Sequence, residues 1–593
     1  MPVGAKQFPS STTDIINTAL RGVLRANPDF SLIESDKVVF LTSSAGANDK
    51  VTLISGGGSG HEPTHAGFVG TGALSAAVAG SVFASPSTKQ IYAGLKAVES
   101  TKGSLIIVKN YTGDVLHFGL AAERVRAHGG NVEVVVVGDD VAVGRKQGGL
   151  VGRRGLAATC LVHKVAGASA QNGDDLSTVT GVAKAIASNV VTIGSSLDHC
   201  NVPGRPFETN LKDNEMEIGM GIHNEPGVKK VSPIPSTSDL IKNELLPLLL
   251  SKEDEDRYFV PFNKGEESVL VVNNLGGLSN LELSAIAETT IQQLASDYSV
   301  TPVRVIVGTL ITALNGAGFS LSLLNATKAS KEAGQDVLAL LDAPTSAPGW
   351  PARANSSGKS SKDLNLVKGE EIPKDEKDSG ISANADSIAA FLKAGIEAIN
   401  EKEPLITRYD TVAGDGDCGE TLVNGGKALL KALEDKSIRL SDGVNGIVDI
   451  SDIVEDSMGG TSGGLYSIFL HALAHGIRTS GQKELSLENF ASSSKIALDS
   501  LYQYTSARAG DRTLIDTLEP FVVTLGSEKD LAKAVKAANE GAESTRKLEA
   551  KFGRASYVSK DEFKEFDKEG GLPDPGAIGL AALLNGFLSA YQK

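Results

Sequence analysis

The sequence predicts a chain of two parts, an α/β part with two subdomains followed by an all-α part. Through about residue 345, short runs of β-branched residues alternate with helical stretches, as in a sheet covered by helices. After about residue 380, apolar residues recur at helical spacing and no convincing strand follows. Between the two parts the composition changes to Pro, Ser, Lys, Gly and Asp, which is typical of a linker.

The α/β part contains seven apolar runs that we expect to be strands. They are Val38–Leu41, Val51–Ile54, Leu105–Val108, Val132–Val137, Val269–Val272, Val303–Val307 and Val337–Leu341. Several lead directly into glycine or polar loops, and open α/β sheets bind ligands at the carboxyl ends of their strands. The extended segment Pro203–Asn214 separates the subdomains, so we expect boundaries at about 1–200 and 201–350.

We expect the linker to cover residues 351–380 and the helical domain to cover residues 381–593. The first helix of that domain has an apolar face formed by Ile388, Phe391, Leu392, Ile396 and Ile399. The linker is long enough to let the two domains meet within one chain or between two chains.

The composition is that of a globular protein and argues against two classes of partner. At 593 residues the chain can form about three to four domain-sized units. The longest apolar run near the middle, Leu245–Leu250, is far too short to cross a bilayer, so no membrane role follows. A net charge of −15 without clustered Lys or Arg argues against a nucleic-acid partner.

Cysteine usage predicts the compartment. The three cysteines, Cys160, Cys200 and Cys418, are odd in number and far apart, which indicates free thiols in a reducing environment. The N-terminal residues lack the apolar core of a signal peptide. We therefore expect a cytoplasmic protein.

A glycine-rich segment, Ser55–Pro63, follows the second expected strand. Its bare backbone N–H groups suit a small polar or anionic ligand, and we expect it to open a helix near Pro63. Its spacing fits neither the dinucleotide fingerprint nor the P-loop. Residues 61–65 also match the H-E-x-x-H zinc pattern, but a zinc protease needs both histidines on a helix. We favour a ligand-contacting His61 and a structural His65, with zinc as the alternative.

Two further motifs carry candidate catalytic groups. Lys109–Asp114 follows an apolar strand, so Asp114 suits a general base and Lys109 suits oxygen recognition; a surface lysine and a turn aspartate are the alternative.

From Met216 to His223 the residues alternate strictly, which predicts that His223 ends a strand above two glycines. An imidazole so placed can act as base, ligand or nucleophile toward a carbonyl, although a lone histidine is more often structural.

Three carboxylates, Asp410, Asp415 and Asp417, fall within eight residues on a segment that we expect to be a loop. Like charges this close destabilise one another unless a cation lies among them, and hard oxygen ligands favour Mg²⁺, which commonly links carboxylates to nucleotide phosphates. The alternatives are a solvated acidic turn or an EF-hand loop. Val412 and Gly414 stand at the third and fifth positions from Asp410, where an EF-hand needs ligands.

Two more segments of the helical domain could accept phosphate. Met458–Gly464 precedes an expected helix, Leu465–Leu473, and forms a second candidate phosphate cradle. Asp574–Gly576 opens the last helix with an N-cap and an N1 proline, so capping alone could explain it. We expect His471 and His475, four residues apart without an acidic partner in view, to pack in the helix core.

Taken together, these motifs resemble those of the single-chain, ATP-dependent dihydroxyacetone kinases (glycerone kinases), and the resemblance runs nearly end to end. The first 350 residues resemble the family's substrate-binding K-type domain through the three motifs around His61, Lys109 and His223. The last 210 or so resemble its nucleotide-binding L-type domain, a helical barrel. The matching segments there are the aspartate triplet, Met458–Gly464, Gly510–Asp516, Gly553–Tyr557 and Asp574–Gly576.

The resemblance implies phosphorylation of dihydroxyacetone, and of glyceraldehyde, with ATP as donor. It implies that His223 bonds covalently to the ketone carbon as a hemiaminal, that Asp114 deprotonates the attacking hydroxyl, and that His61 hydrogen-bonds near it. The implied substrate contacts are Gly58, Ser59, Gly60, His61, Lys109 and Asp114, and the implied Mg²⁺ ligands are Asp410, Asp415 and Asp417. The implied nucleotide contacts are Cys418, Gly419, Glu420, Thr421, Thr461, Ser462, Thr505, Leu514, Arg554, Asp574, Pro575 and Gly576. The family also implies a homodimer with the active site shared between chains.

Two other functions fit the same motifs. One is a triokinase that also cyclises FAD to cyclic FMN, a lyase activity of the same nucleotide domain in some relatives. The other is a regulator that binds dihydroxyacetone without turnover, against which the intact aspartate triplet argues.

Overall fold

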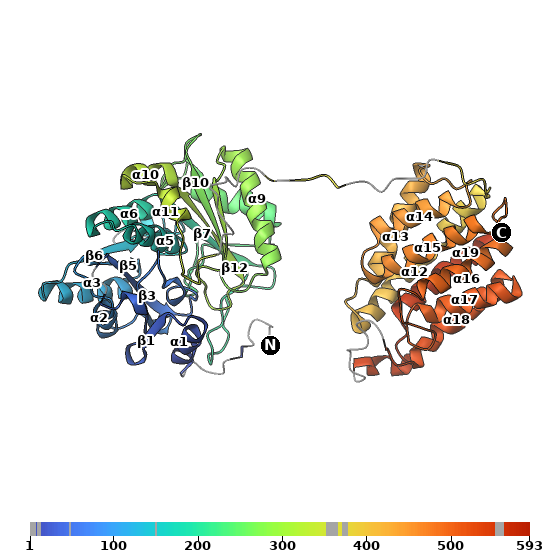
Figure 1. Cartoon of the computed structure of the whole chain (residues 1–593), viewed down its shortest axis with the longest axis horizontal. Helices are drawn as coiled ribbons and strands as arrows, with labels where there is room; N and C mark the ends of the chain where they lie inside the picture. Colours follow the sequence, from blue (N-terminus) through green and yellow to red (C-terminus); the bar gives the residue numbers. More distant parts are fainter. Residues whose placement is uncertain are drawn as a thin grey trace. The chain divides into compact units, whose positions relative to one another are not determined.

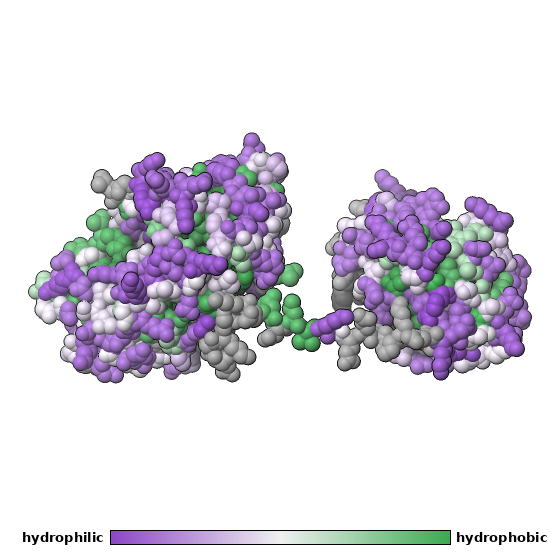
Figure 2. Space-filling view, turned by 90° about the horizontal axis from the view of Figure 1, so that it is seen from above, coloured by the Kyte–Doolittle hydropathy of each residue, from purple (hydrophilic) through white to green (hydrophobic). Residues whose placement is uncertain are grey.

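The structure is a computed structural model that describes residues 7–8, 14–46, 49–148, 151–351, 364, 366–369, 377–551 and 562–593. The chain divides into two compact units, Met1–Val367 and Lys368–Lys593 (Figure 1). The division falls within the residues expected to form the linker, most of which lie outside the described residues. Hydrophilic residues cover most of the visible face of each unit, with smaller apolar areas between them (Figure 2).

The first unit contains two six-stranded sheets. The first sheet has the order β1-β2-β4-β3-β5-β6, in which β4, β3, β5 and β6 run parallel. Its strands are β1 (Phe30–Ile33), β2 (Val38–Leu41), β3 (Thr52–Ser59), β4 (Ala76–Val82), β5 (Ser104–Lys109) and β6 (Val132–Val137). The second sheet has the order β11-β10-β12-β7-β8-β9 and is antiparallel except between β10 and β11. Its strands are β7 (Val190–Ser196), β8 (Met216–Ile218), β9 (Lys229–Val231), β10 (Ser268–Asn274), β11 (Arg304–Gly308) and β12 (Gly318–Asn325).

The helices of the first unit pack on the faces of both sheets. They are α1 (Ile15–Ala26), α2 (Thr88–Ala97), α3 (Thr112–Ala127), α4 (Arg145–Gly148), α5 (Ala158–Gln171), α6 (Leu176–Ser188), α7 (Thr237–Asp239), α8 (Leu246–Leu250), α9 (Asn280–Tyr298), α10 (Ala326–Ala333) and α11 (Val337–Asp342). Side chains alternate along β5, so Ile106 packs with α2 and α3 while Leu105 packs with α5 and α6. The same core joins α5 and α6 to the second sheet through Val190 and Val271, so these helices lie between the sheets (Figure 1).

The second unit is entirely helical in the described residues, as the sequence predicts. Its helices are α12 (Ala385–Ala413), α13 (Cys418–Glu434), α14 (Asn445–Ser457), α15 (Gly460–Thr479), α16 (Leu487–Leu501), α17 (Ile515–Glu528), α18 (Leu531–Ser544) and α19 (Pro575–Tyr591). The expected apolar face of α12 is present, with Leu392, Ile396 and Ile399 buried. Among the described residues, no helix combines the length and the apolar character needed to cross a membrane.

The fold class is confirmed, but three local expectations are wrong. Val337–Leu341 is helix α11, because its buried residues Val337, Leu340 and Leu341 follow helical spacing and Asp336 caps the helix. The glycine segment opens no helix; β3 continues through it to Ser59, and a turn and a short 3₁₀ helix, Ala66–Phe68, follow. Strand β8 ends at Ile218, so His223 lies in the turn that follows and not at a strand end.

Glycine explains why β3 continues. A Cβ at Gly56 would lie 2.3 Å from the carbonyl oxygen of Val78, and one at Gly58 would lie 2.7 Å from the backbone nitrogen of Ala84. Because glycine has no Cβ, the backbone of β3 can lie close to β4 and to the residues that follow β4. The same closeness brings the backbone of β3 next to the polar groups described below.

Candidate active site

His223 lies in the turn between β8 and β9, and two groups hold its ring. Its Nδ1 lies 2.9 Å from Oε1 of Glu225, whose Oε2 also accepts a hydrogen bond of 2.9 Å from the backbone N–H of His223. Its Nε2 lies 3.0 Å from Nε2 of His61. Three rings meet it edge to face, with centroid distances of 4.7 Å to His61, 5.1 Å to Phe83 and 4.8 Å to Tyr111. The imidazole therefore has one orientation.

Hydrogen-bond partners fix the proton positions on both rings. Nδ1 of His61 lies 2.7 Å from the carbonyl oxygen of Thr312, which can only accept, so Nδ1 carries the hydrogen and Nε2 is an acceptor. Burial, with the positive charge of Lys109 nearby, lowers the pKa of His61 well below its usual range and keeps the ring neutral. The proton between the two Nε2 atoms therefore belongs to His223.

Glu225 balances the charge of His223. Burial opposes ionisation of Glu225, but the hydrogen bond and the positive charge of His223 outweigh it and lower the pKa of Glu225 to about 2. In this arrangement His223 is an imidazolium that donates from Nδ1 to a carboxylate and from Nε2 to a neutral imidazole. Sequence reasoning missed Glu225, although it stands two residues from His223.

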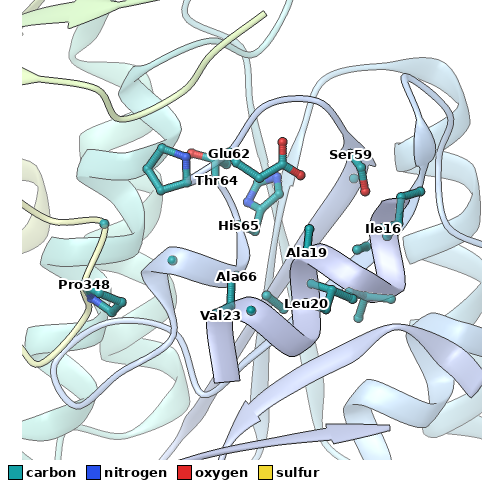
Figure 3. Close-up of a pocket in the computed structure, with 18 of the residues that line it drawn as sticks. Ile16, Ala19, Leu20, Val23, Ser59, Glu62, Thr64, His65, Ala66 and Pro348 are labelled. Atoms are coloured by element: carbon teal, nitrogen blue, oxygen red, sulfur yellow. The ribbon is translucent and has the colours of Figure 1, made fainter. Parts of the chain in front are cut away.

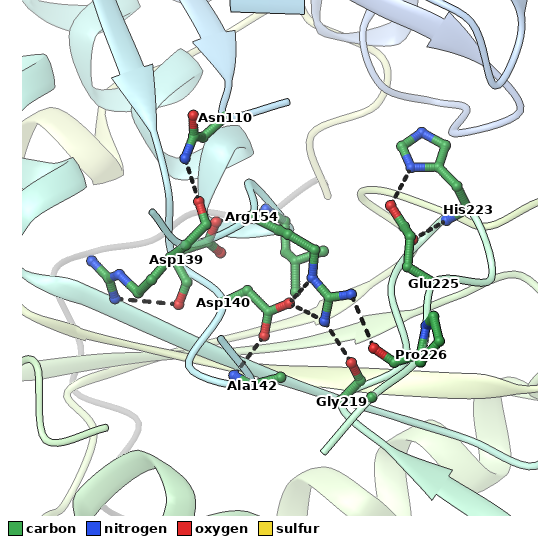
Figure 4. A network of polar contacts seen from close by, with 12 residues as sticks. Asn110, Asp139, Asp140, Ala142, Arg154, Gly219, His223, Glu225 and Pro226 are labelled. Carbon is green, nitrogen blue, oxygen red and sulfur yellow. Dashed lines mark hydrogen bonds and ion pairs between the residues drawn. The ribbon is translucent and has the colours of Figure 1, made fainter. Parts of the chain in front are cut away.

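A second polar network holds the turn itself (Figure 4). Arg154 donates to the carbonyl oxygen of Gly219 at 2.6 Å and to that of Pro226 at 3.5 Å, so it joins both ends of the turn. Its Nε donates to Asp140 at 2.7 Å. Burial raises the pKa of Asp140 to about 6, although Arg154 opposes that shift and keeps the carboxylate ionised at neutral pH. The Arg154–Asp140 pair thus holds both ends of the turn that carries His223.

Gly221 is required within this turn. A Cβ there would lie 2.0 Å from Oε2 of Glu225 and 2.7 Å from Nη1 of Arg154. The two charged side chains occupy the space that any larger residue would need.

Lys109 and Asp114 meet over the backbone of β3. Lys109 ends β5 and Asp114 stands in the first turn of α3, and both are buried. A Cβ at Gly57 would lie 3.0 Å from Nζ of Lys109 and 3.5 Å from Oδ2 of Asp114. Burial lowers the pKa of Lys109, although Asp114 opposes that shift. Within the described residues Oδ1 of Asp114 has no hydrogen-bond partner, so it can accept one from a ligand.

The other expected ligand contacts of the first unit lie beside this point. Gly58 and Ser59 end β3, and the Ser59 hydroxyl donates to the carbonyl oxygen of Gly80 at 2.9 Å. The N–H of Gly60 donates to Glu62 at 2.9 Å. A cavity of about 600 Å³ lies along Gly57, Gly58 and Ser59, with α1 on its other side (Figure 3).

The zinc interpretation of residues 61–65 finds no support in the geometry. Neither histidine is on an α-helix, and both bond to protein atoms: His61 to Thr312 and His65 to Lys109. In the described part of the chain, the groups of residues that could jointly hold a metal ion contain neither histidine.

The aspartate triplet of the second unit forms such a group. Oxygen atoms of Asp410, Asp415 and Asp417 all lie within 4.8 Å of one another. The expected loop is wrong for Asp410, which is buried in the last turn of α12; residues 414–417 alone connect α12 to α13. One Asp410 oxygen accepts from the N–H of Cys418 at 2.9 Å, and the remaining carboxylate oxygens suit a hard divalent cation.

The expected nucleotide contacts gather around Cys418. Burial, with the charges of Asp410, Asp574 and Asp417, raises the pKa of the Cys418 thiol to about 12, and a hydrogen bond to Ser462 opposes this shift. Cys418, Gly419, Glu420 and Thr421 form the first turn of α13, and Thr461 and Ser462 that of α15. Helix α15 begins at Gly460, five residues before the expected start.

Asp574 is the N-cap of α19 and accepts from the N–H of Ala577 at 2.8 Å, with Pro575 at N1 as expected. Burial raises its pKa to about 6, with Arg512 opposing the shift. A Cβ at Gly576 would lie 3.6 Å from Cβ of Leu514, so that residue is adjacent. Thr505 follows α16 and accepts from Arg508 through its carbonyl oxygen.

Arg554 and the segment Gly553–Tyr557 lie outside the described residues. Sequence reasoning missed Tyr466, and it matched Arg512 only as part of the segment Gly510–Asp516. Tyr466 packs in the same apolar cluster as Cys418, and burial, with the charges of Cys418 and Asp574, raises the pKa of its hydroxyl.

The expectation for the two histidines of α15 is wrong. His471 and His475 are exposed, and Nε2 of His471 lies 3.7 Å from Oδ1 of Asp452. Asp452, Glu455 and His471 form the second group that could hold an ion, and such exposed groups are common without one. The acidic partners come from α14, which the sequence does not place beside α15.

Comparison with known proteins gives a consistent picture. Two family models match the chain, a Dak1 domain over residues 21–349 and a DAK2 domain over residues 412–589. Dihydroxyacetone kinase 2 of Saccharomyces cerevisiae is 57% identical over 596 residues, which cover 99% of this chain and 99% of the relative. Triokinase/FMN cyclase of Mus musculus is 36% identical over 604 residues, which cover 100% and 99%. The dihydroxyacetone kinase from C. freundii in complex with AMP-PNP and Mg²⁺ is a similar structure, with a TM-score of 0.64 and 30% identity over 99% of this chain and 100% of that chain.

The family models and these relatives assign the chain to the two-domain kinases, with an α/β unit that contains a buried imidazole and carboxylate site and a helical unit with aspartates at helix ends. Because both family models match and the identity extends over the whole length, the chain belongs to the dihydroxyacetone kinase family.

Proposed function

We propose that the chain transfers the γ-phosphoryl group of ATP to a hydroxyl of dihydroxyacetone and forms dihydroxyacetone phosphate. The observation that carries this proposal is the aspartate group at the start of α13, in a chain similar to a kinase whose structure holds AMP-PNP and Mg²⁺. Glyceraldehyde, which also has a carbonyl beside a hydroxyl, is the second substrate of the proposal.

His223 captures the carbonyl compound. The proton on Nε2 moves to His61, which frees the lone pair of Nε2 to attack the ketone carbon. As the C–N bond forms and the C=O π bond breaks, His61 returns that proton to the carbonyl oxygen. The ring of the adduct keeps its Nδ1 proton and its positive charge, which Glu225 balances, so atoms and charges are conserved. Glycerol has no carbonyl and is rejected by this chemistry.

Asp114 and Lys109 act on the captured substrate. Asp114 accepts the proton of the attacking hydroxyl, through the oxygen that has no partner in the described residues. Lys109 binds a substrate oxygen on the face of Gly57. Burial of both groups strengthens these interactions by excluding water.

The helical unit holds the nucleotide. The residues that fit Mg²⁺ are Asp410, Asp415 and Asp417, and the metal when bound neutralises phosphate charge. The backbone N–H groups at the starts of α13 and α15 bind phosphate oxygens, with Thr461 and Ser462 adding hydroxyl donors. Cys418 to Thr421, Thr505, Leu514, Arg554 and Asp574 to Gly576 complete the proposed nucleotide contacts.

The test is release of ADP from Mg-ATP on addition of dihydroxyacetone. The expected result is turnover in the unaltered chain and none in His223→Ala. No ADP release would contradict the kinase proposal and favour a regulator that only binds the ketone.

Formation of cyclic FMN from FAD is a second candidate activity, favoured by the relative named triokinase/FMN cyclase. It needs the nucleotide site alone, so we expect it to survive His223→Ala. Absence of cyclic FMN with Mn²⁺ present would contradict it.

We also propose a cytoplasmic homodimer in which one chain's helical unit serves its partner. The resemblance to the family supports it. His223→Ala and Asp415→Asn chains, inactive alone, would then regain activity when mixed and reassembled. Mixtures that stay inactive despite dimers in light scattering would contradict sharing between chains.

A further inference from the structure

Behind Lys109 lies a buried chain of polar side chains that the proposed mechanism does not use. Nζ of Lys109 lies 2.8 Å from Nε2 of His65, and Nδ1 of His65 lies 3.1 Å from the hydroxyl of Ser55. The same hydroxyl lies 3.1 Å from Nε2 of His163. All four side chains are at most 6% exposed. They come from β5, the turn after β3, β3 itself and α5, so the tertiary fold assembles them.

One set of proton positions satisfies this chain. The ammonium of Lys109 only donates, so Nε2 of His65 accepts and its Nδ1 carries the hydrogen. The Ser55 hydroxyl donates to the carbonyl oxygen of Ile107 at 2.7 Å, so its oxygen accepts from Nδ1 of His65 and from Nε2 of His163. Nδ1 of His163 is then a bare acceptor, and within the described residues it has no partner.

Both imidazoles stay neutral at physiological pH. Burial, with the charge of Lys109 adding to it, lowers the pKa of His65 well below its usual range. The same two causes lower the pKa of His163 to about 3. A neutral His65 can accept from Lys109, whereas an imidazolium would repel it.

The position of His65 matters for the ligand. A Cβ at Gly57 would lie 3.0 Å from Nζ of Lys109 and 3.5 Å from Nε2 of His65, so both atoms border the same point. An ammonium has three hydrogens. One N–H of Lys109 is directed to Nε2 of His65. The tetrahedral geometry of the ammonium and the nearby carboxylate of Asp114 then set the directions of the other two N–H bonds.

We propose that His65 is a positioning residue that orients the Lys109 ammonium toward a substrate oxygen, with Ser55 and His163 holding its imidazole in the accepting tautomer. This role rests on the proposed function, in which Lys109 contacts the substrate. It gives a purpose to the second histidine of the H-E-x-x-H pattern without a metal.

The experiment compares His65→Leu, which removes the acceptor, with His65→Gln, which puts an amide oxygen near the position of Nε2. His65→Leu should raise KM for dihydroxyacetone about tenfold, because a hydrogen bond to a charged group is lost, and should leave KM for ATP unchanged. His65→Gln should recover most of the loss. His128→Leu, which changes an exposed histidine of the same unit, is the control and should have no effect.

A second measurement separates orientation from folding. The concentration of [2-¹³C]dihydroxyacetone that half-saturates the covalent adduct, read by ¹³C NMR, should rise with KM in His65→Leu. An unchanged KM in folded His65→Leu would overturn the role, as would a loss in His65→Gln equal to that in His65→Leu. Absence of turnover in the unaltered chain would instead overturn the proposed function, and this role with it.

Discussion

Replacing Glu225 by Gln tests whether its carboxylate stabilises the charged ring of His223. The substitution keeps the shape of the side chain and removes the charge that faces Nδ1 at 2.9 Å. The pKa of Glu225 falls from 4.5 to about 2 beside His223, and about 1.4 kcal/mol per unit gives about 3.5 kcal/mol. Because the side chain is 32% exposed, solvent screening reduces this to roughly 2 kcal/mol.

The ring carries the same positive charge in the free protein and in the adduct, so the carboxylate stabilises both states. Only the part of that free energy that the free ring avoids by releasing its proton weakens the adduct, and we therefore expect Glu225→Gln to weaken the adduct of dihydroxyacetone severalfold. The assay is a ¹³C NMR titration with [2-¹³C]dihydroxyacetone, in which the ketone carbon changes shift when it bonds to nitrogen. Glu253→Gln, the same change at an exposed position of the same unit, should bind as the unaltered chain does. An adduct in Glu225→Gln that saturates at the unaltered concentration would refute the charge-balance argument.

Three further predictions concern the metal site, the glycine strand and acid stability. Asp415→Asn should abolish ADP release and leave the ¹³C adduct intact, and loss of both would contradict separate sites. Gly57→Ala should raise KM for dihydroxyacetone about tenfold by crowding Lys109, whereas Gly119→Ala, with no atom within 4 Å, should not. Folding lowers the pKa of His163 from 6.5 to about 3, so between these pH values the unfolded state binds a proton that the folded state does not bind. The free energy of unfolding therefore decreases as pH falls from 6.5 toward 3. In denaturant titrations, His163→Gln should reduce the slope of the free energy of unfolding against pH by up to about 1.4 kcal/mol per pH unit. An unchanged slope would contradict a buried neutral ring.

The fold class followed from periodicity, which is a local property. The apolar face of α12 and the strands around Leu105 and Val132 are readable because burial imposes spacings of 3.6 and 2 residues. Strand β4 was missed because Ala76–Val82 consists mostly of small residues, which have low strand propensity. Glycine at Gly56 and Gly58 suggested a loop, whereas it allows a close strand approach.

The candidate site was predicted in its residues and not in its contacts. His61 and His223 are 162 residues apart, and no local pattern shows that their rings share a proton. Glu225 had one available signal, a carboxylate two residues after a histidine in a glycine-rich turn. Tyr466 reaches the nucleotide residues only through helix packing, which a single sequence does not specify.

The position of α5 and α6 between the two sheets sets how the first unit melts. One continuous core includes residues of both helices and of both sheets, so the two sheets share the apolar layer between them, although the other face of each sheet has an apolar cluster of its own. Heat or urea should dismantle residues 14–351 in one cooperative step, and a cavity cut into α5 would weaken both halves at once. Transferring one sheet with α5 and α6 into another enzyme would expose the apolar faces of these helices that pack on the other sheet. Domain exchange should therefore use residues 14–351 as a whole.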